Sequence, residues 1–213
     1  MDYRVDRFRQ AQSKILGVDD LAKRVDEAKK LGQTVVFTNG CFDILHLGHV
    51  RYLEAARRLG DLLVVGINTD STVRKLKGPG RPVNSEFERL EVLASLESVD
   101  YVTLFAEDLP IDIILAVKPS IHAKGGDYTL DDLPEADAVK QVGGITRLIP
   151  FESTETQGKS TTSVIERIMK GRENAHATEP GLPGSGLPLG IASPSSATSG
   201  SESDAGKRDR RQS

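Results

Sequence analysis

Residues 34–59 read TVVFTNGCFDILHLGHVRYLEAARRL and place three local patterns in succession. The apolar, β-branched run at 34–37 predicts a strand, which stops at Asn39-Gly40. The loop that follows carries His46 and His49, and the apolar residues at 50, 53, 56 and 59 predict an amphipathic helix behind it. An open α/β sheet binds its ligand outside the carboxyl end of a strand, facing the start of a helix. We therefore expect the functional site in this loop.

The rest of the chain alternates between strand and helix patterns. After a helix at 18–31 and the opening strand and helix, further strands are expected at 62–68, 101–105, 121–124 and 145–150. Helices are expected at 70–76, 86–97, 111–117 and 133–142, with a last one beginning at Ser163. This alternation predicts an α/β fold: a doubly wound, five-stranded parallel sheet with helices on both faces.

Composition divides the chain into three parts. Residues 18–171 suffice for the α/β domain, and residues 1–17 are interpreted as an N-terminal extension. Residues 172–213 contain no aromatic residue and are rich in Gly, Pro and Ser. Such a segment buries too little apolar surface to offset the entropy lost on ordering, so a disordered tail is expected.

Charge and apolar content exclude several classes of protein. The formal net charge of −3 gives no basic balance that would favour nucleic acid. No apolar run reaches the roughly 18 residues of a membrane span, and the charged N-terminus lacks the apolar segment of a secretory signal. The single cysteine, Cys41, allows no internal disulfide and suits a reducing compartment. We expect a cytoplasmic protein that binds neither nucleic acid nor membranes.

Two common nucleotide-binding motifs are absent. The loop after the first strand lacks the G-x-G-x-x-G fingerprint of dinucleotide-binding folds. Gly158-Lys159-Ser160 looks like the end of a P-loop, but Ser153 stands where that motif needs its first glycine.

His46-Leu47-Gly48-His49 is the strongest candidate for chemistry. Two histidines three apart near a helix start lie on roughly the same side, where backbone N–H groups and the helix dipole favour an anion. Imidazoles there can donate hydrogen bonds to phosphate or offset charge in a transition state. Two other interpretations remain open: capping or surface histidines, and a metal site, for which no third ligand has zinc-like spacing.

Two segments resemble the signatures of the nucleotidylyltransferase superfamily. His46-Leu47-Gly48-His49 matches HxGH, and the segment 160–163 (STTS) resembles ISSTxxR or, in cytidylyltransferases, GISTS. Lys159 replaces the usual isoleucine, and Arg167 is not at the arginine spacing. In chain order, FTNGCFDILHLGHVRYLEAA, VGINTD, LKGPGRPVN, ERLEVLASLESVDYV, KGGDY and GKSTTSVIERI are similar to the heptose 1-phosphate adenylyltransferases, the nucleotidyl-transfer half of bifunctional ADP-heptose synthases. The resemblance covers about residues 14–171.

The resemblance implies a Rossmann-like fold and a reaction. ATP and a heptose 1-phosphate would give ADP-heptose and pyrophosphate by direct in-line attack on the α-phosphorus. Mg²⁺ would accompany ATP, with no metal site built by the protein. Members of the family are often dimers or larger, so a homodimer is expected. Two alternatives are a cytidylyltransferase acting on an alcohol phosphate such as glycerol 3-phosphate, and a nucleotide-binding regulator without catalysis.

The resemblance also assigns roles to residues. The expected catalytic contacts are His46, His49 and Lys77. The expected nucleotide-binding residues are Thr38, Asn39, Gly40, Phe42, Gly48, Asp127, Ser160, Thr161 and Thr162. The expected contacts to substrate phosphate are Lys75, Arg81, Arg89 and Lys124, the first two on a basic Gly/Pro loop at 75–83 that suits a lid. Asp43 would orient a histidine or water or cap the loop, Asp70 would reach a ribose hydroxyl or cap a helix, and Cys41 would be a packed small residue.

Overall fold

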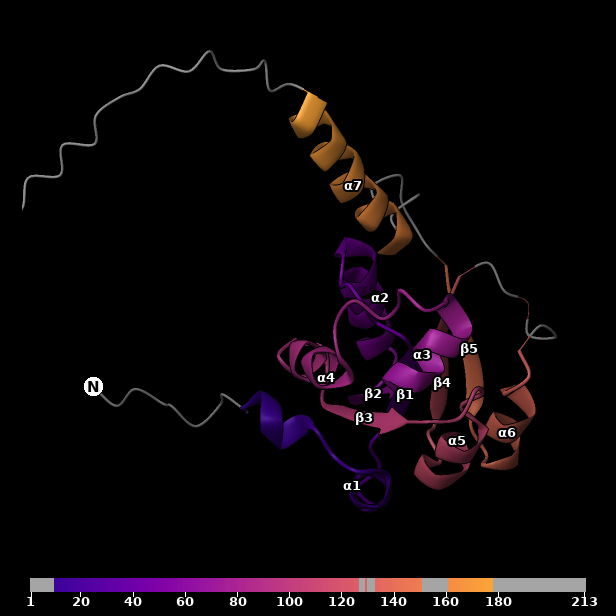
Figure 1. Ribbon diagram of the computed structural model, residues 1–213. Coiled ribbons are helices and arrows are strands. Elements are labelled where there is room, and N and C mark those ends of the chain that lie inside the picture. The colour runs from indigo at the N-terminus through magenta and orange to yellow at the C-terminus, as the bar shows by residue number, and fades with distance from the viewer. Residues whose placement is uncertain (1–9, 127–128, 130–132, 151–160, 178–213) are drawn as a thin grey trace, which may run out of the picture.

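Five parallel strands form one sheet in the computed structural model, which describes residues 10–126, 129, 133–150 and 161–177 (Figure 1). The strands are β1 (Val35–Gly40), β2 (Leu62–Asn68), β3 (Tyr101–Phe105), β4 (Ile121–Gly125) and β5 (Ile145–Ile149), in the order β3-β2-β1-β4-β5. All neighbouring pairs are parallel. The expected five-stranded parallel sheet is confirmed.

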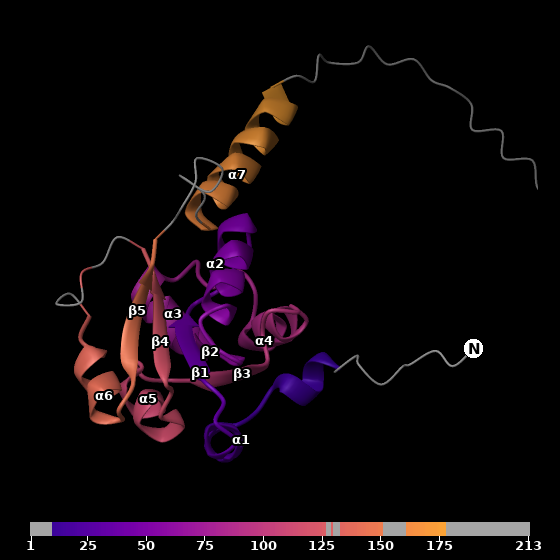
Figure 2. The same ribbon diagram turned by 180° about the vertical axis from the view of Figure 1, so that it is seen from behind.

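Helices cover both faces of the sheet, as expected for a doubly wound fold (Figure 2). Successive strand residues point to opposite faces, so Val36 and Val65 belong to one core cluster whereas Val35 and Val64 belong to the other. The first cluster packs under α2 (Leu47–Arg57) and α4 (Glu86–Ala94), and the second under α1 (Val18–Lys30), α5 (Ile111–Val117) and α6 (Ala136–Gln141).

Two further helices lie near the carboxyl ends of the strands. α3 (Asp70–Lys77) begins directly after β2, with Thr69 as its N-cap. α7 (Thr161–Ala177) begins near the start of α2 and extends away from the sheet in both views (Figures 1 and 2). None of the helices in the described part of the chain is long and apolar enough to span a membrane.

Secondary structure lies on both sides of each expected domain boundary. Residues 11–14 form a short 3-10 helix, and the Lys14 Nζ donates to the backbone oxygens of Leu96 (3.1 Å) and Val99 (2.9 Å). This part of the expected N-terminal extension therefore packs on the domain. At the other end, α7 continues to Ala177, so the expected boundary after residue 171 falls inside a helix, because residues 172–177 include good helix formers. Residues 178–213 lie outside the described residues.

The sheet has a short seam between β1 and β4, where the strand order reverses. β1 and β2 pair along six residues, from Val35↔Leu62 to Gly40↔Ile67. β1 and β4 pair only at Val36↔Ile121 and Phe37↔His122. Ligands of open α/β sheets bind at such a reversal, beyond the carboxyl ends of the strands.

Candidate active site

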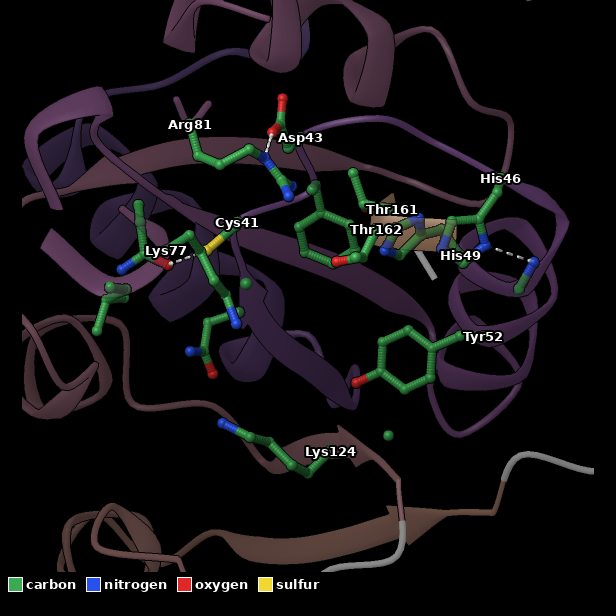
Figure 3. A pocket seen from close by; sticks show the side chains of 17 residues that line it. Cys41, Asp43, His46, His49, Tyr52, Lys77, Arg81, Lys124, Thr161 and Thr162 are labelled. Atoms are coloured by element: carbon green, nitrogen blue, oxygen red, sulfur yellow. Dashed lines mark hydrogen bonds and ion pairs between the residues drawn. The ribbon is translucent and has the colours of Figure 1, made fainter. Parts of the chain in front are cut away.

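A cavity of about 670 Å³ lies beyond the carboxyl ends of β1, β2 and β4 (Figure 3). Its walls come from the loop after β1, the ends of β2 and β4, the α3 helix with the loop after it, and the start of α7. Most of the residues expected to act in the site line this cavity: Asn39, Gly40, Phe42, His46, Gly48, His49, Lys77, Arg81, Lys124, Thr161 and Thr162.

The two histidines sit at the start of α2 with their rings together. Their ring centroids are 4.0 Å apart, and Phe42 packs on His49 with centroids 5.4 Å apart. His46 is the N-cap of α2, and its Nδ1 accepts a hydrogen bond from the Gly48 backbone N–H (3.2 Å). Because Nδ1 acts as an acceptor, a neutral His46 carries its proton on Nε2. His46 thus caps the helix through Nδ1, and its one N–H donor is on Nε2.

His49 is neutral at physiological pH. Burial, and then the proximity of His46, lower the pKa of His49 to about 4. Its Nδ1 is buried and has no hydrogen-bond partner within the described residues. A buried polar atom without a partner beside a cavity is the kind of group that a ligand satisfies.

Three cations line the cavity, and two are partly engaged by carboxylates. The Lys124 Nζ donates to the Glu135 Oε1 (2.5 Å). Burial, the largest single influence, acts to raise the pKa of Glu135, but the hydrogen bond and the charge of Lys124, together with smaller contributions from the backbone and His122, lower the pKa overall. The Arg81 Nε donates to the Asp43 Oδ2 (2.5 Å). Lys77 makes no hydrogen bond or ion pair within the described residues, so its full charge is available to an anion.

Asp43 fastens the Gly/Pro loop to the loop after β1. Its Oδ1 accepts the backbone N–H groups of Val83 (2.8 Å) and Asn84 (3.0 Å), and its backbone oxygen accepts the Asn84 Nδ2 (2.7 Å). Its side chain is 1% exposed. Asp43 therefore orients Arg81 and the loop rather than a histidine. Figure 3 shows this pair across the cavity from Lys124.

The start of α7 closes the cavity on another side. Thr161 and Thr162 line it, and the Thr161 Oγ1 donates to the Ile44 backbone oxygen (3.4 Å). This contact joins the second signature segment to the loop that leads into the first. Asp127 and Ser160, both expected in the site, lie outside the described residues.

Three residues expected in the site do not line the cavity. Thr38 is fully buried, and its Oγ1 lies 2.6 Å from the Tyr52 hydroxyl. Lys75 is exposed and pairs with Asp108. Arg89 is buried beneath the loops.

Arg89 ties together three chain segments that surround the cavity. Its Nη1 donates to the Cys41 backbone oxygen (2.6 Å), and its Nη2 to the Asn68 backbone oxygen (2.8 Å) and the Asp70 Oδ1 (2.8 Å). Its Nε donates to the Asn84 backbone oxygen (3.2 Å). Arg89 therefore holds the loops in place. It also forms an ion pair with Asp70, the first residue of α3 after the Thr69 N-cap.

The structure adds two polar residues that sequence reasoning missed. The Tyr52 ring lines the cavity, and its hydroxyl donates to the Ala123 backbone oxygen (3.0 Å) while Thr38 donates to it. Burial raises the pKa of Tyr52 to about 12. Asn68 ends β2 beside Cys41, whose Sγ is 3.8 Å from the Asn68 Oδ1. Two features of the sequence could have identified them: Asn68 is the polar residue that ends an apolar strand, and Tyr52 lies one helical turn after His49.

The arrangement suits an anionic ligand more than a cysteine nucleophile. The burial of Cys41 raises the pKa of its thiol, which disfavours a thiolate nucleophile. Within the described residues, no group of three or more His, Cys, Asp or Glu side chains is placed to hold a metal ion. Two imidazoles, three cations and a helix start instead face a polyanion-sized cavity.

Curated relatives match most of the chain. The chain is 50% identical over 162 residues to Bifunctional protein HldE of Trichlorobacter lovleyi, which covers 76% of this chain and 32% of that protein. It is 53% identical over 139 residues to Bifunctional protein HldE of Nitratiruptor sp., covering 65% and 28%. The chain thus spans about a third of the length of these relatives.

One solved structure and one protein family also match the chain. The lipopolysaccharide core biosynthesis protein from Thermoplasma volcanium is 33% identical, with a TM-score of 0.49 over 57% of this chain and 98% of that one. The cytidylyltransferase-like family matches residues 37–167, a range that contains every residue lining the cavity. The chain therefore belongs to the cytidylyltransferase-like family.

Proposed function

We propose that this chain is an adenylyltransferase that transfers AMP from ATP to a heptose 1-phosphate, giving ADP-heptose and pyrophosphate. One observation supports the nucleotidyl-transfer part: two adjacent, mutually tilted imidazoles at a helix start face a cavity that is also lined by Lys77 and by a second helix start. Family membership supports the same reaction class. Adenine and heptose are proposed because the stretches LKGPGRPVN and KGGDY resemble the heptose 1-phosphate adenylyltransferases.

The reaction needs no nucleophile from the protein. A phosphate oxygen of the sugar 1-phosphate attacks the α-phosphorus of ATP and forms the new P–O bond. The bond from the α-phosphorus to the bridging oxygen breaks, and pyrophosphate leaves with the electron pair. The protein's contribution is to align the two substrates and to stabilise the charge that develops on the equatorial oxygens.

Each cavity residue has a task in this step. His46 and the neutral His49 supply N–H donors to the α-phosphate oxygens, and Lys77 supplies a full positive charge to the transition state or the leaving pyrophosphate. Arg81, held by Asp43, is oriented toward the same anions. The hydroxyls of Thr161 and Thr162 and the start of α7 bind phosphate from the other side.

Magnesium would enter with the substrate. The described carboxylate that lines the cavity, Asp43, is already saturated by Arg81 and two backbone N–H groups. Mg²⁺ is commonly held by substrate phosphates and water with few protein ligands, and this donor set fits MgATP as the substrate. The ion would neutralise part of the triphosphate charge.

A product assay tests the proposal. Purified protein is incubated with ATP, CTP, GTP or UTP, Mg²⁺, and a panel of heptose 1-phosphates, hexose 1-phosphates and glycerol 3-phosphate, and pyrophosphate release is measured. We expect release with ATP and a heptose 1-phosphate, together with an equimolar ADP-sugar. Release only with CTP and glycerol 3-phosphate would assign a cytidylyltransferase, and nucleotide binding without turnover on any pair would assign a regulator.

The stereochemistry at phosphorus tests the direct displacement separately. With ATP made chiral by sulfur at the α-phosphorus, one in-line attack inverts the configuration. Retention would require two displacements and an enzyme-bound nucleotidyl group, which would contradict the mechanism.

A further inference from the structure

A partly buried hydrogen bond to His122 fixes which end of the Asn39 amide faces the cavity. Asn39 lies at the carboxyl end of β1 and lines the cavity. Its side-chain Oδ1 lies 3.1 Å from the Nε2 of His122, a fully buried residue of β4. Phe37 and His122 are paired neighbours across the β1–β4 seam, and their rings stack with centroids 5.8 Å apart. The imidazole is therefore held rigidly beneath Asn39.

Two proton arrangements share these heavy-atom positions. In the first, the His122 Nε2–H donates to the Asn39 oxygen, and the Asn39 NH₂ group faces the cavity. In the second, the ring proton is on Nδ1, the amide is turned over, and its oxygen faces the cavity. The two arrangements therefore give Asn39 opposite preferences: a ligand acceptor in the first and a ligand donor in the second.

The surroundings of His122 select the first arrangement. Burial, and then the nearby charge of Lys124, lower the pKa of His122 to about 4 although Glu135 opposes the shift, so the ring is neutral and has one proton. The His122 Nδ1 is buried without a partner in the described part of the chain. A proton there would leave a buried N–H unsatisfied, which is rarer and more unfavourable than an unpaired buried acceptor. The proton therefore belongs on Nε2.

We propose that His122 is a positioning residue that turns Asn39 so that its NH₂ group donates to a phosphate oxygen of the bound substrate. This inference rests on the proposed function, and it adds a specific donor to the site. A phosphate oxygen is the acceptor that matches the rest of the cavity, where Lys77, Arg81 and Lys124 supply positive charge. The phosphate belongs either to the nucleotide or to the sugar phosphate, and separate KM measurements tell these apart.

Four variants test the proposal. Asn39→Asp keeps the acceptor for His122 but replaces the NH₂ donor with a carboxylate oxygen, and it should raise KM for one of the two substrates 10- to 100-fold. His122→Phe keeps the stacked ring but frees the amide, and it should raise the same KM about 5- to 10-fold. His122→Gln places an N–H near the Nε2 position and should restore KM to within about 2-fold of the wild type. In the double variant Asn39→Asp/His122→Phe, the two effects should not add.

The tautomer of His122 can be measured without an activity assay. In the unliganded protein at pH 7, ¹⁵N NMR of the histidine rings should show the His122 proton on Nε2. A proton on Nδ1 would overturn the inference, and so would a His122→Phe variant whose melting temperature changes while both KM values stay at the wild-type level. If no substrate pair is turned over, the proposed function fails by itself, and the inference is then decided by whether Asn39→Asp weakens pyrophosphate binding in titration calorimetry.

Discussion

Replacing Arg89 with methionine distinguishes two possible roles of this residue: stabilising the fold and binding the substrate phosphate. The resemblance assigns Arg89 to the acceptor phosphate, whereas the structure buries its side chain completely and directs it to the backbone oxygens of Cys41, Asn68 and Asn84 and to the Asp70 carboxylate. Methionine fills the space of the aliphatic stem and removes all four hydrogen bonds and the charge. We therefore expect a loss of stability before any specific loss of binding.

The magnitude follows from those four contacts. A hydrogen bond to a charged group contributes about 1.5–3 kcal/mol, so four would sum to about 6–12 kcal/mol if they were independent. They share one guanidinium, and Asp70 is partly exposed and regains water when Arg89 is lost. Breaking one side of a buried ion pair costs about 3–5 kcal/mol, which is the destabilisation we expect. For a chain of this size it corresponds to a melting temperature lower by about 6–20 °C.

Urea unfolding and thermal melts followed by circular dichroism measure the loss. Arg74→Met, on an exposed position of α3, is the matched control and should change stability by less than about 0.5 kcal/mol. Arg89→Lys keeps one charge but cannot reach four acceptors, so it should recover only part of the stability. A melting temperature within 2 °C of the wild type together with a large rise in KM for the sugar phosphate would refute the structural role.

The other predictions concern the cavity and its histidines. His49→Ala should lower kcat at least 100-fold in pyrophosphate-release assays because it removes a donor to the transition state, and the melting temperature should stay nearly unchanged. Lys77→Ala should lower kcat/KM about 30- to 100-fold, whereas Lys75→Ala, which loses only an exposed pair with Asp108, should retain wild-type turnover; equal effects would contradict this difference. Because the pKa values of His49 and His122 fall from 6.5 to about 4 on folding, the unfolded chain binds more protons between these values, and stability present above pH 6.5 should be lost as pH falls toward 4. His122→Phe should flatten that dependence in urea titrations at pH 7, 6 and 5.

The fold could be predicted because its strands are apolar runs bounded by breakers. Strands buried on both faces lack polar alternation and stand out from the helices between them, which is why residues 34–40 and 62–68 were clear. The packing of residues 11–14 could not be predicted, because it depends on two backbone oxygens about 80 residues away. The extent of α7 was missed because composition was averaged over a tail that starts with helix-forming residues.

Site residues could be predicted where a phosphate-binding residue type stands next to the end of a strand or the start of a helix. His46 and His49 lie at the start of α2, which the apolar pattern predicted, and Thr161 lies at the start of α7, two residues before the expected start at Ser163. Lys75 and Lys77 could not be separated, because the end of α3 was interpreted as loop; two residues apart on a helix they point to different sides. Arg89 could not be recognised as buried, because three of its acceptors are backbone oxygens that leave no trace in residue type.

The short seam between β1 and β4 has a consequence for local stability. Where the backbone pairing stops after Phe37 and His122, side chains supply the cross-links: Tyr52 joins Thr38 to the Ala123 backbone oxygen, and Asn39 reaches His122. These bonds involve residues that line the cavity, so a bound substrate would brace the least paired part of the sheet. Native-state hydrogen exchange should then show amides at the carboxyl ends of β1 and β4 opening without global unfolding, and slowing when nucleotide is added. Substrate binding would therefore stabilise the contact between the two halves of the sheet, which meet at β1 and β4.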